Sequence, residues 1–145
     1  MTKSEAIEQI RKAKAGHKRW MSYAKAMHMG IKVDKDATPL VETDCSFGKW
    51  YYGEGQIFSE MDSYQAIEEP HEMLHQTYMK LFKTKKQPLK TGLLVSKSRA
   101  LKERQNELDE LMKQLTYVSQ MLMENLKEFE SDLKNMSDLE FRQLQ

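Results

Sequence analysis

The sequence predicts an all-α protein made of amphipathic helices, the last of which is unusually long. The 145 residues include only three Pro and six Gly, and good helix formers such as Met, Leu, Glu, Lys and Gln are abundant. Apolar residues recur every three or four positions in the first 29 residues and every seven positions after residue 100. A chain of this length suits one domain with a helical extension.

A first helix is expected from about Ser4 to Met29. Ser4 or Thr2 can cap its start, and Gly30 sits where a left-handed residue would end it. His17 falls on the apolar stripe of this helix. The stripe consists of Ile7, Ile10, Lys14, His17, Trp20 or Met21, Ala24 and Met27.

A polar connection is predicted over residues 31–36, followed by short helices. Thr38-Pro39 is typical of an N-cap with proline in the first turn, and Thr43-Asp44 offers a second start. The helix that begins at one of these places should carry Cys45 and Trp50. Gly53-Glu54-Gly55 then interrupts the chain.

Apolar residues between this interruption and Pro70 predict one or two further turns, through Phe58, Met61, Tyr64 and Ile67. Pro70 fits best in the first turn of the next helix. The inward stripe of that helix holds two histidines, and its members are His71, Leu74, His75, Tyr78 and Leu81 or Phe82.

A basic loop is expected over residues 83–92, and a long helix from about Leu93 to beyond Leu133. At about 1.5 Å per residue, 40 residues extend about 60 Å, so part of this helix must pack on another chain, on a longer host protein or on nothing. Its apolar stripe first follows heptads and then shifts by one position, as a period of 3.6 requires. The heptad residues are Leu101, Leu108, Leu115, Leu122, Phe129 and Met136, with Leu111 and Val118 beside them and Leu126 and Leu133 continuing the stripe.

Three of the four histidines and the single cysteine fall on predicted inward faces. An isolated imidazole in an apolar core needs a partner for each ring nitrogen, so three imidazoles with a thiol favour metal binding over packing. His71 and His75 are spaced i, i+4, which places both rings on one helix face. Thiolate and imidazole ligands together suit zinc. We therefore predict one zinc ion held by His17, Cys45, His71 and His75.

The string His71-Glu72-Met73-Leu74-His75 also satisfies the H-E-x-x-H signature of zinc peptidases, in which the glutamate acts as general base. A catalytic zinc keeps one coordination position open, whereas His17 and Cys45 would fill both remaining positions. No strand pattern is available to hold an extended peptide. We therefore expect no enzyme, and Glu72 is interpreted as an exposed helix residue.

Three blocks of residues resemble the chemoreceptor zinc-binding (CZB) domain. They are Gly16-His17-Lys18-Arg19-Trp20, then Asp44-Cys45-Ser46-Phe47-Gly48-Lys49-Trp50-Tyr51, and then Ile67-Glu68-Glu69-Pro70-His71-Glu72-Met73-Leu74-His75. The C-x-F-G-K-W-Y block is the most specific. The resemblance extends from about Ile7 to the first turns of the last helix.

The resemblance implies an antiparallel four-helix bundle with a short extra helix, a zinc site of three His and one Cys, and a homodimer. It also implies a regulatory role beside chemoreceptors or cyclic-di-GMP-forming cyclases, although no receptor hairpin or cyclase motif is present. We expect residues 1–95 to form the zinc-binding bundle, completed by the first turns of the last helix, and residues 96–145 to form a bundle or coiled-coil connector. His28 has no place in the family pattern.

Composition narrows the classes of partner. The net charge of +1 provides no global field for nucleic acid or an anionic membrane, although charge can be uneven locally. The basic loop lacks the interleaved aromatic residues of a nucleic-acid site. No apolar run is long enough to span a bilayer, and the start of the chain lacks a signal peptide. We expect a cytoplasmic protein with neither nucleic acid nor membrane as partner.

Two functions remain open at this stage. The first is a sensor that responds to zinc or to an oxidant such as hypochlorous acid, because zinc keeps Cys45 as the oxidisable thiolate. The second is a structural zinc protein that dimerises or scaffolds a partner through the stripe from Leu101 to Leu122.

Overall fold

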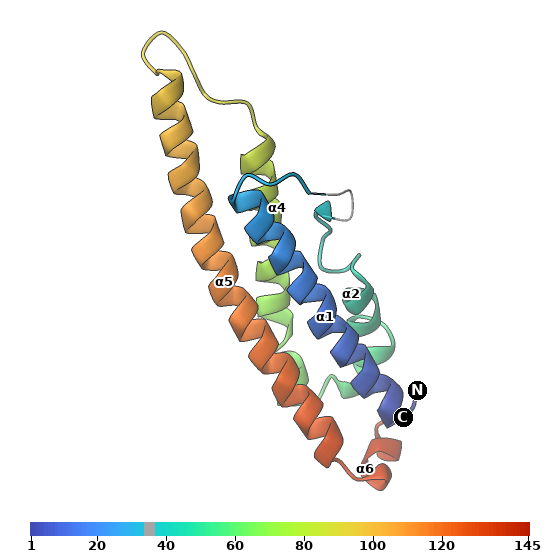
Figure 1. Cartoon of the computed structure of the whole chain (residues 1–145). Coiled ribbons are helices and arrows are strands. Elements are labelled where there is room, and N and C mark those ends of the chain that lie inside the picture. The colour runs from blue at the N-terminus through green and yellow to red at the C-terminus, as the bar shows by residue number, and fades with distance from the viewer. Residues whose placement is uncertain (34–36) are drawn as a thin grey trace.

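The computed structural model describes residues 1–33 and 37–145, and these ranges contain helices and connections but no β-strand. The all-α prediction is therefore confirmed. Three long helices lie side by side, and α5 runs in the opposite direction to α4 because one loop joins them at the same end (Figure 1). The elements are α1 (Lys3–His28), α2 (Ser46–Tyr51), the 3-10 helix η2 (Glu54–Phe58), α3 (Asp62–Gln65), α4 (Glu68–Lys86), α5 (Lys97–Asn135) and α6 (Asp138–Gln143).

The first helix matches its prediction closely. Thr2 is its N-cap, and a capping box joins Thr2 to Glu5, in which each residue receives a hydrogen bond from the backbone of the other. Gly30 follows the helix with φ of 80°, the left-handed conformation expected from the sequence. The buried face of α1 includes His17, which is 5% exposed.

Of the two starts predicted for the helix near Cys45, Thr38-Pro39 is wrong, whereas Thr43-Asp44 lies within two residues of the observed N-cap. No helix starts at Thr38 in the described residues, and α2 begins at Ser46 with Cys45 as its N-cap. The Cys45 Sγ accepts a hydrogen bond from the Gly48 backbone N–H at 3.1 Å, and this contact sets the start of the helix. The polar connection predicted over residues 31–36 is only partly visible, since 34–36 lie outside the described residues.

The long helix α5 begins at Lys97, four residues after the predicted start. Ser96 caps it by accepting a hydrogen bond from the Arg99 backbone N–H, and residues 92–95 form a turn before the cap. The chain ends in a short helix that was not predicted, α6, which starts from a capping box between Ser137 and Glu140. This S-x-x-E pattern was the signal for it.

One core runs through all the long helices. On α5 the heptad residues from Leu108 to Phe129 are buried, together with Leu126 and Leu133, as predicted, whereas Met136 caps the end of the helix and is partly buried. Leu101 is the exception at 48% exposed, because the first turns of α5 extend beyond the end of α1 (Figure 1). Apolar side chains of α5 therefore pack against both α1 and α4 over most of the helix. In the first turns of α5, the contact with α1 is absent (Figure 1).

None of the helices in the described ranges combines the length and the apolar run that crossing a bilayer requires.

A buried carboxylate ties α1 to α5. Glu130 is 5% exposed and accepts hydrogen bonds from Lys14 and Arg11 of α1 and from Lys134 of its own helix. These bonds, led by that of Lys134, lower the pKa of Glu130 to about 2. The carboxylate therefore stabilises the fold fully above its unfolded pKa near 4.5, and this contribution is lost as the pH falls toward 2.

Replacing Glu130 by glutamine is expected to lower the free energy of unfolding by about 2 kcal/mol at pH 7, because three cations lose their buried partner. The difference from the unmodified protein should shrink between pH 4.5 and 2. Urea unfolding of both proteins at pH 7 and at about pH 2 measures this difference in the free energy of unfolding. The exposed Glu128→Gln is the control and should change stability by less than about 0.5 kcal/mol. Equal losses at pH 7 and in acid would contradict the assignment.

Candidate metal centre

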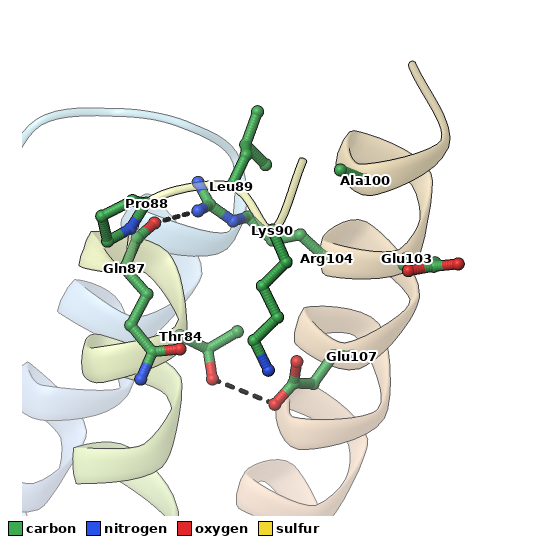
Figure 2. Close-up of a pocket in the computed structure, with 9 residues that line it drawn as sticks. All are labelled: Thr84, Gln87, Pro88, Leu89, Lys90, Ala100, Glu103, Arg104 and Glu107. Atoms are coloured by element: carbon green, nitrogen blue, oxygen red, sulfur yellow. Dashed lines mark hydrogen bonds between the residues drawn. The ribbon is translucent and has the colours of Figure 1, made fainter. Parts of the chain in front are cut away.

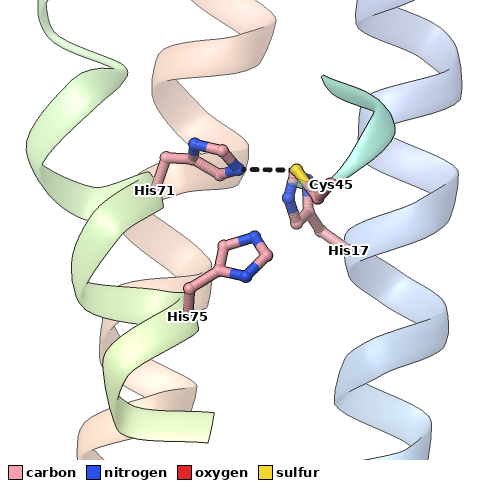
Figure 3. Close-up of side chains that lie close together, drawn as sticks. All are labelled: His17, Cys45, His71 and His75. Atoms are coloured by element: carbon pink, nitrogen blue, oxygen red, sulfur yellow. Dashed lines mark hydrogen bonds between the residues drawn. The ribbon is translucent and has the colours of Figure 1, made fainter. Parts of the chain in front are cut away.

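Four side chains from three elements converge on one point inside the bundle (Figure 3). His17 comes from the middle of α1, Cys45 from the N-cap of α2, and His71 and His75 from the first half of α4. Their ligand atoms all lie within 4.8 Å of one another. The structure thus brings together all four residues that the sequence analysis selected.

The spacing of these atoms suits a tetrahedral ion. The Cys45 Sγ lies 3.4 Å from the His71 Nε2. Ligands bound to zinc at about 2.3 Å for sulfur and 2.0–2.1 Å for nitrogen lie roughly 3.3–3.6 Å apart. The widest separation in the cluster, up to 4.8 Å, exceeds this range by about 1 Å. Small rotations of the side chains can close that difference.

Each histidine of the cluster holds a buried ring nitrogen for which the described part of the chain offers no hydrogen-bond partner: the His17 Nδ1, the His71 Nδ1 and the His75 Nε2. Buried polar atoms are normally paired, because an unpaired one loses its hydration without compensation. The unpaired His75 Nε2 indicates a missing partner such as a metal ion. His71 instead faces the cluster with its Nε2, beside the Cys45 Sγ, so its Nδ1 is not the atom that would bind the same ion.

The tautomer of His75 is fixed by the backbone. Its Nδ1 lies 2.7 Å from the Leu40 carbonyl oxygen, which can only accept, so Nδ1 carries the hydrogen and donates it. The Nε2 lone pair is then left free for an ion, an arrangement common for histidine ligands. Nearby, the Tyr78 hydroxyl donates to the Ala37 carbonyl at 2.5 Å. The sequence analysis did not predict that the Leu40 carbonyl orients His75, because a backbone acceptor leaves no signal in the pattern of side chains.

Burial sets the protonation of the cluster. It lowers the pKa of His17 to about 4 and that of His71 to about 2, with smaller contributions from the neighbouring imidazoles, and it also lowers the pKa of His75. The rings are therefore neutral, the form that binds metals, at physiological pH.

The thiol needs a cation to ionise. Burial raises the pKa of Cys45, and the hydrogen bond from the Gly48 backbone N–H opposes this only in part. A divalent cation favours the thiolate strongly. Three neutral imidazoles and a thiol of this kind form a donor set that fits zinc.

Aromatic rings surround the cluster as packing groups. The Phe47 ring meets His71 edge-on at a centroid distance of 5.1 Å, and the Trp20 ring lies 4.8 Å from that of His75. Among the described residues no indole or phenol donates a hydrogen bond to a ligand side chain, and the Leu40 carbonyl orients His75 instead. A cavity of about 70 Å³ adjoins the cluster and is lined by residues that include His17, Trp20, Cys45 and His75.

Two residues considered in the sequence analysis lie outside the cluster. Glu72 is exposed, and its carboxylate accepts a hydrogen bond from Gln76 on the same helix at 2.7 Å. The general base that the H-E-x-x-H signature would require therefore faces solvent. His28 ends α1, where its Nε2 lies 2.7 Å from the Asp109 carboxylate of α5.

Residues 17–82 match the family model described as the chemoreceptor zinc-binding domain. The matched range contains all four clustered side chains and confirms the resemblance, although it is shorter than the stretch expected from the sequence. The chain matches no curated protein and no solved structure. Zinc, the predicted cofactor, agrees with the zinc-binding family and with a His and Cys cluster suited to a metal ion.

Proposed function

We propose, from the chemoreceptor zinc-binding domain that residues 17–82 carry, that this protein is a regulatory module whose state depends on one zinc ion. The ligands are His17, Cys45, His71 and His75. The observation that carries the proposal is the convergence of their ligand atoms within 4.8 Å, with the buried His75 Nε2 left without a partner among the described residues.

The position of Cys45 makes the site suitable for sensing an oxidant. Cys45 is at once a proposed ligand and the N-cap of α2, where its Sγ receives the Gly48 N–H. The thiolate reacts with hypochlorous acid to give sulfenic acid and chloride, with the oxygen and proton of the acid passing to sulfur. Oxidation thus removes a ligand and alters a helix cap in one step.

The proposed ligands lie on α1, at the start of α2 and on α4, so the loss of one ligand can change how these three elements pack. Release of Cys45 removes the link that the ion makes between the start of α2 and the histidines of α1 and α4. Both α1 and α4 pack along α5, so a change in their relative position acts on that helix. A helix of 39 residues carries such a shift beyond the zinc-binding region.

The finer expectations remain proposals. We propose an antiparallel four-helix arrangement, a homodimer, a cytoplasmic location, and a chemoreceptor or diguanylate cyclase as partner in bacterial chemotaxis or cyclic-di-GMP signalling. The division of the chain into a bundle over residues 1–95 and a connector over 96–145 also stays a prediction. A catalytic role is disfavoured by the exposed position of Glu72.

The alternative is a structural zinc protein, in which the ion stays in place and the chain dimerises or scaffolds a partner through α5. The exposure of Leu101 favours it, since that side chain lies on the heptad stripe and is 48% exposed. Oxidation of Cys45 distinguishes the two functions, because only the sensor is expected to release its zinc.

The test follows zinc release and the state of Cys45 together. One equivalent of hypochlorous acid is expected to release the zinc, measured with a chromogenic chelator, as mass spectrometry records oxidation of Cys45. The chain also has 11 methionines that react with this oxidant. Dithiothreitol reduces a sulfenic acid but not a methionine sulfoxide, so zinc rebinding after dithiothreitol alone assigns the release to Cys45.

Zinc that stays bound while Cys45 remains reduced would contradict the oxidant sensor and favour the structural site. An unreactive thiol with readily exchanging zinc would favour a sensor of zinc concentration instead.

A further inference from the structure

The loop between α4 and α5 carries two adjacent leucines, Leu93 and Leu94, that are almost fully exposed. Gly92 and Val95 exchange two backbone hydrogen bonds of 3.2 Å, which close a tight turn around residues 93 and 94. At the tip of this turn Leu93 is 107% exposed and Leu94 is 93% exposed. Two adjacent leucines at full exposure are unusual, because each loses the free energy that burial would supply.

Positive charge surrounds this tip. Residues 83–104 contain six Lys, two Arg and one Glu, a net charge of +7 in a chain whose total is +1, so the remaining residues carry −6. The expectation that no membrane is bound rested on the total charge and on the lack of a membrane-spanning run, and neither describes how the charge is distributed along the chain. The structure collects the charge at one end of the molecule, on the last turns of α4, the loop and the first turns of α5 (Figure 1).

Contacts below the tip brace the hairpin. Figure 2 shows a cavity of about 170 Å³ between the end of α4 and the start of α5. Across it the Thr84 hydroxyl donates to the Glu107 carboxylate at 3.2 Å, and the Arg104 guanidinium donates to the Gln87 carbonyl. These bonds hold the two helix ends together, so the leucines are presented on a fixed stem.

We propose that this tip docks on the surface of a membrane rich in anionic phospholipids. Leu93 and Leu94 enter the region between headgroups and acyl chains, and the surrounding Lys and Arg bind the lipid phosphates. Glu103 and Glu107 lie in the braced cavity, so the phosphates are bound by the outer basic side chains and not inside it.

The charge and the leucines select this occupant among others. A second copy of the chain would bring two clusters of net charge +7 against each other, which opposes dimerisation through the tip. Nucleic acid would bind the positive charge but would offer the two exposed leucines no apolar contact. Residues 83–104 also contain no aromatic residue that could stack on a base. An anionic membrane uses both features.

Vesicle sedimentation of the full chain tests the proposal. The partition coefficient is expected to be at least about tenfold higher on vesicles with roughly 30 mol% phosphatidylserine than on phosphatidylcholine alone, and to fall at high salt. Leu93→Asn with Leu94→Asn should lower it about tenfold, without harm to the fold because both side chains are exposed. The matched control is Leu139→Asn, 67% exposed on α6 at the opposite end, which should leave it within about twofold.

A second pair of variants isolates the charge. Lys86→Gln with Lys97→Gln, both exposed and outside the cavity lining, should lower binding about tenfold, whereas Lys127→Gln with Arg142→Gln, which removes the same charge far from the tip, should change it by less than about twofold.

Three results would overturn the proposal. They are an absence of binding to anionic vesicles, binding that the two leucine substitutions leave unchanged, and half-saturation by a short DNA duplex at a lower concentration than by the vesicles.

Discussion

Replacing His71 by glutamine is expected to abolish zinc-dependent stabilisation of the protein. His71 is fully buried, and its Nε2 lies 3.4 Å from the Cys45 Sγ at the centre of the cluster. A ligand that binds only the folded state at about a thousandfold excess over its Kd adds about 4 kcal/mol of stability. For a chain of this length that corresponds to a rise in Tm of roughly 13 °C.

The measurement compares Tm with and without a strong chelator. The chelator should lower the Tm of the unmodified protein by that amount and leave the Tm of His71→Gln unchanged. This difference holds even if the substitution weakens the metal-free fold. His28→Gln is the matched control, because His28 pairs with Asp109 outside the cluster and its loss should preserve the response to the chelator. A normal response in His71→Gln would remove His71 from the ligand set.

Replacing Gly48 by alanine is expected to produce the largest loss from a substitution outside the ligands. A Cβ at Gly48 would collide with the Glu42 backbone carbonyl and lie only 3.2 Å from the Thr43 Cα. The backbone at 42–43 must then move, and it leads directly into Cys45. The Gly48 N–H also donates to the Cys45 Sγ. We expect a loss of about 2–4 kcal/mol in stability and a drop of about tenfold or more in zinc affinity.

Gly16→Ala provides the comparison. Gly16 precedes His17 on α1, and a Cβ there would meet nothing within 4 Å. Alanine should stabilise the helix by up to about 1 kcal/mol and leave zinc affinity unchanged. Urea unfolding and competition with a fluorescent zinc chelator measure both variants. Equal changes in stability and zinc affinity in the two variants would contradict the close packing of α2 on the backbone of residues 42–43.

The long helices and the clustered side chains were predictable because their signals are local or periodic. His17, His71 and His75 lie on stripes with a spacing of three or four residues, and such a stripe faces the core wherever the helix packs. The start of α1 followed from a capping pattern that involves only neighbouring residues. These signals need no knowledge of the tertiary contacts.

The start of α2 could not be predicted in the same way. Thr38-Pro39 carries the usual sequence of a helix start, but the helix begins where Cys45 caps it. Cysteine is not among the common capping residues, and its position depends on the packing of the segment against Glu42. The support of His75 by the Leu40 carbonyl is likewise a tertiary contact between backbone and side chain.

The apolar periodicity of the last helix also did not predict that Leu93 and Leu94 are exposed in a turn. Leu93 was placed at the start of the long helix, whereas Ser96 caps α5 and leaves residues 93 and 94 in a turn. The capping serine was visible in the sequence, but the apolar run before it favoured an earlier start. The exposure of Leu101 agrees with the expectation that part of the long helix lacks a packing partner in this chain, because the first turns of α5 extend beyond the end of α1 (Figure 1).

X-ray absorption at the zinc edge, on protein with its zinc content measured, determines whether these four side chains bind the ion. One zinc per chain with one sulfur at about 2.3 Å and three nitrogens at about 2.0–2.1 Å is the predicted result. Absence of zinc, or a first shell that lacks sulfur, would contradict the assignment of Cys45 and the three histidines as the ligands of the site.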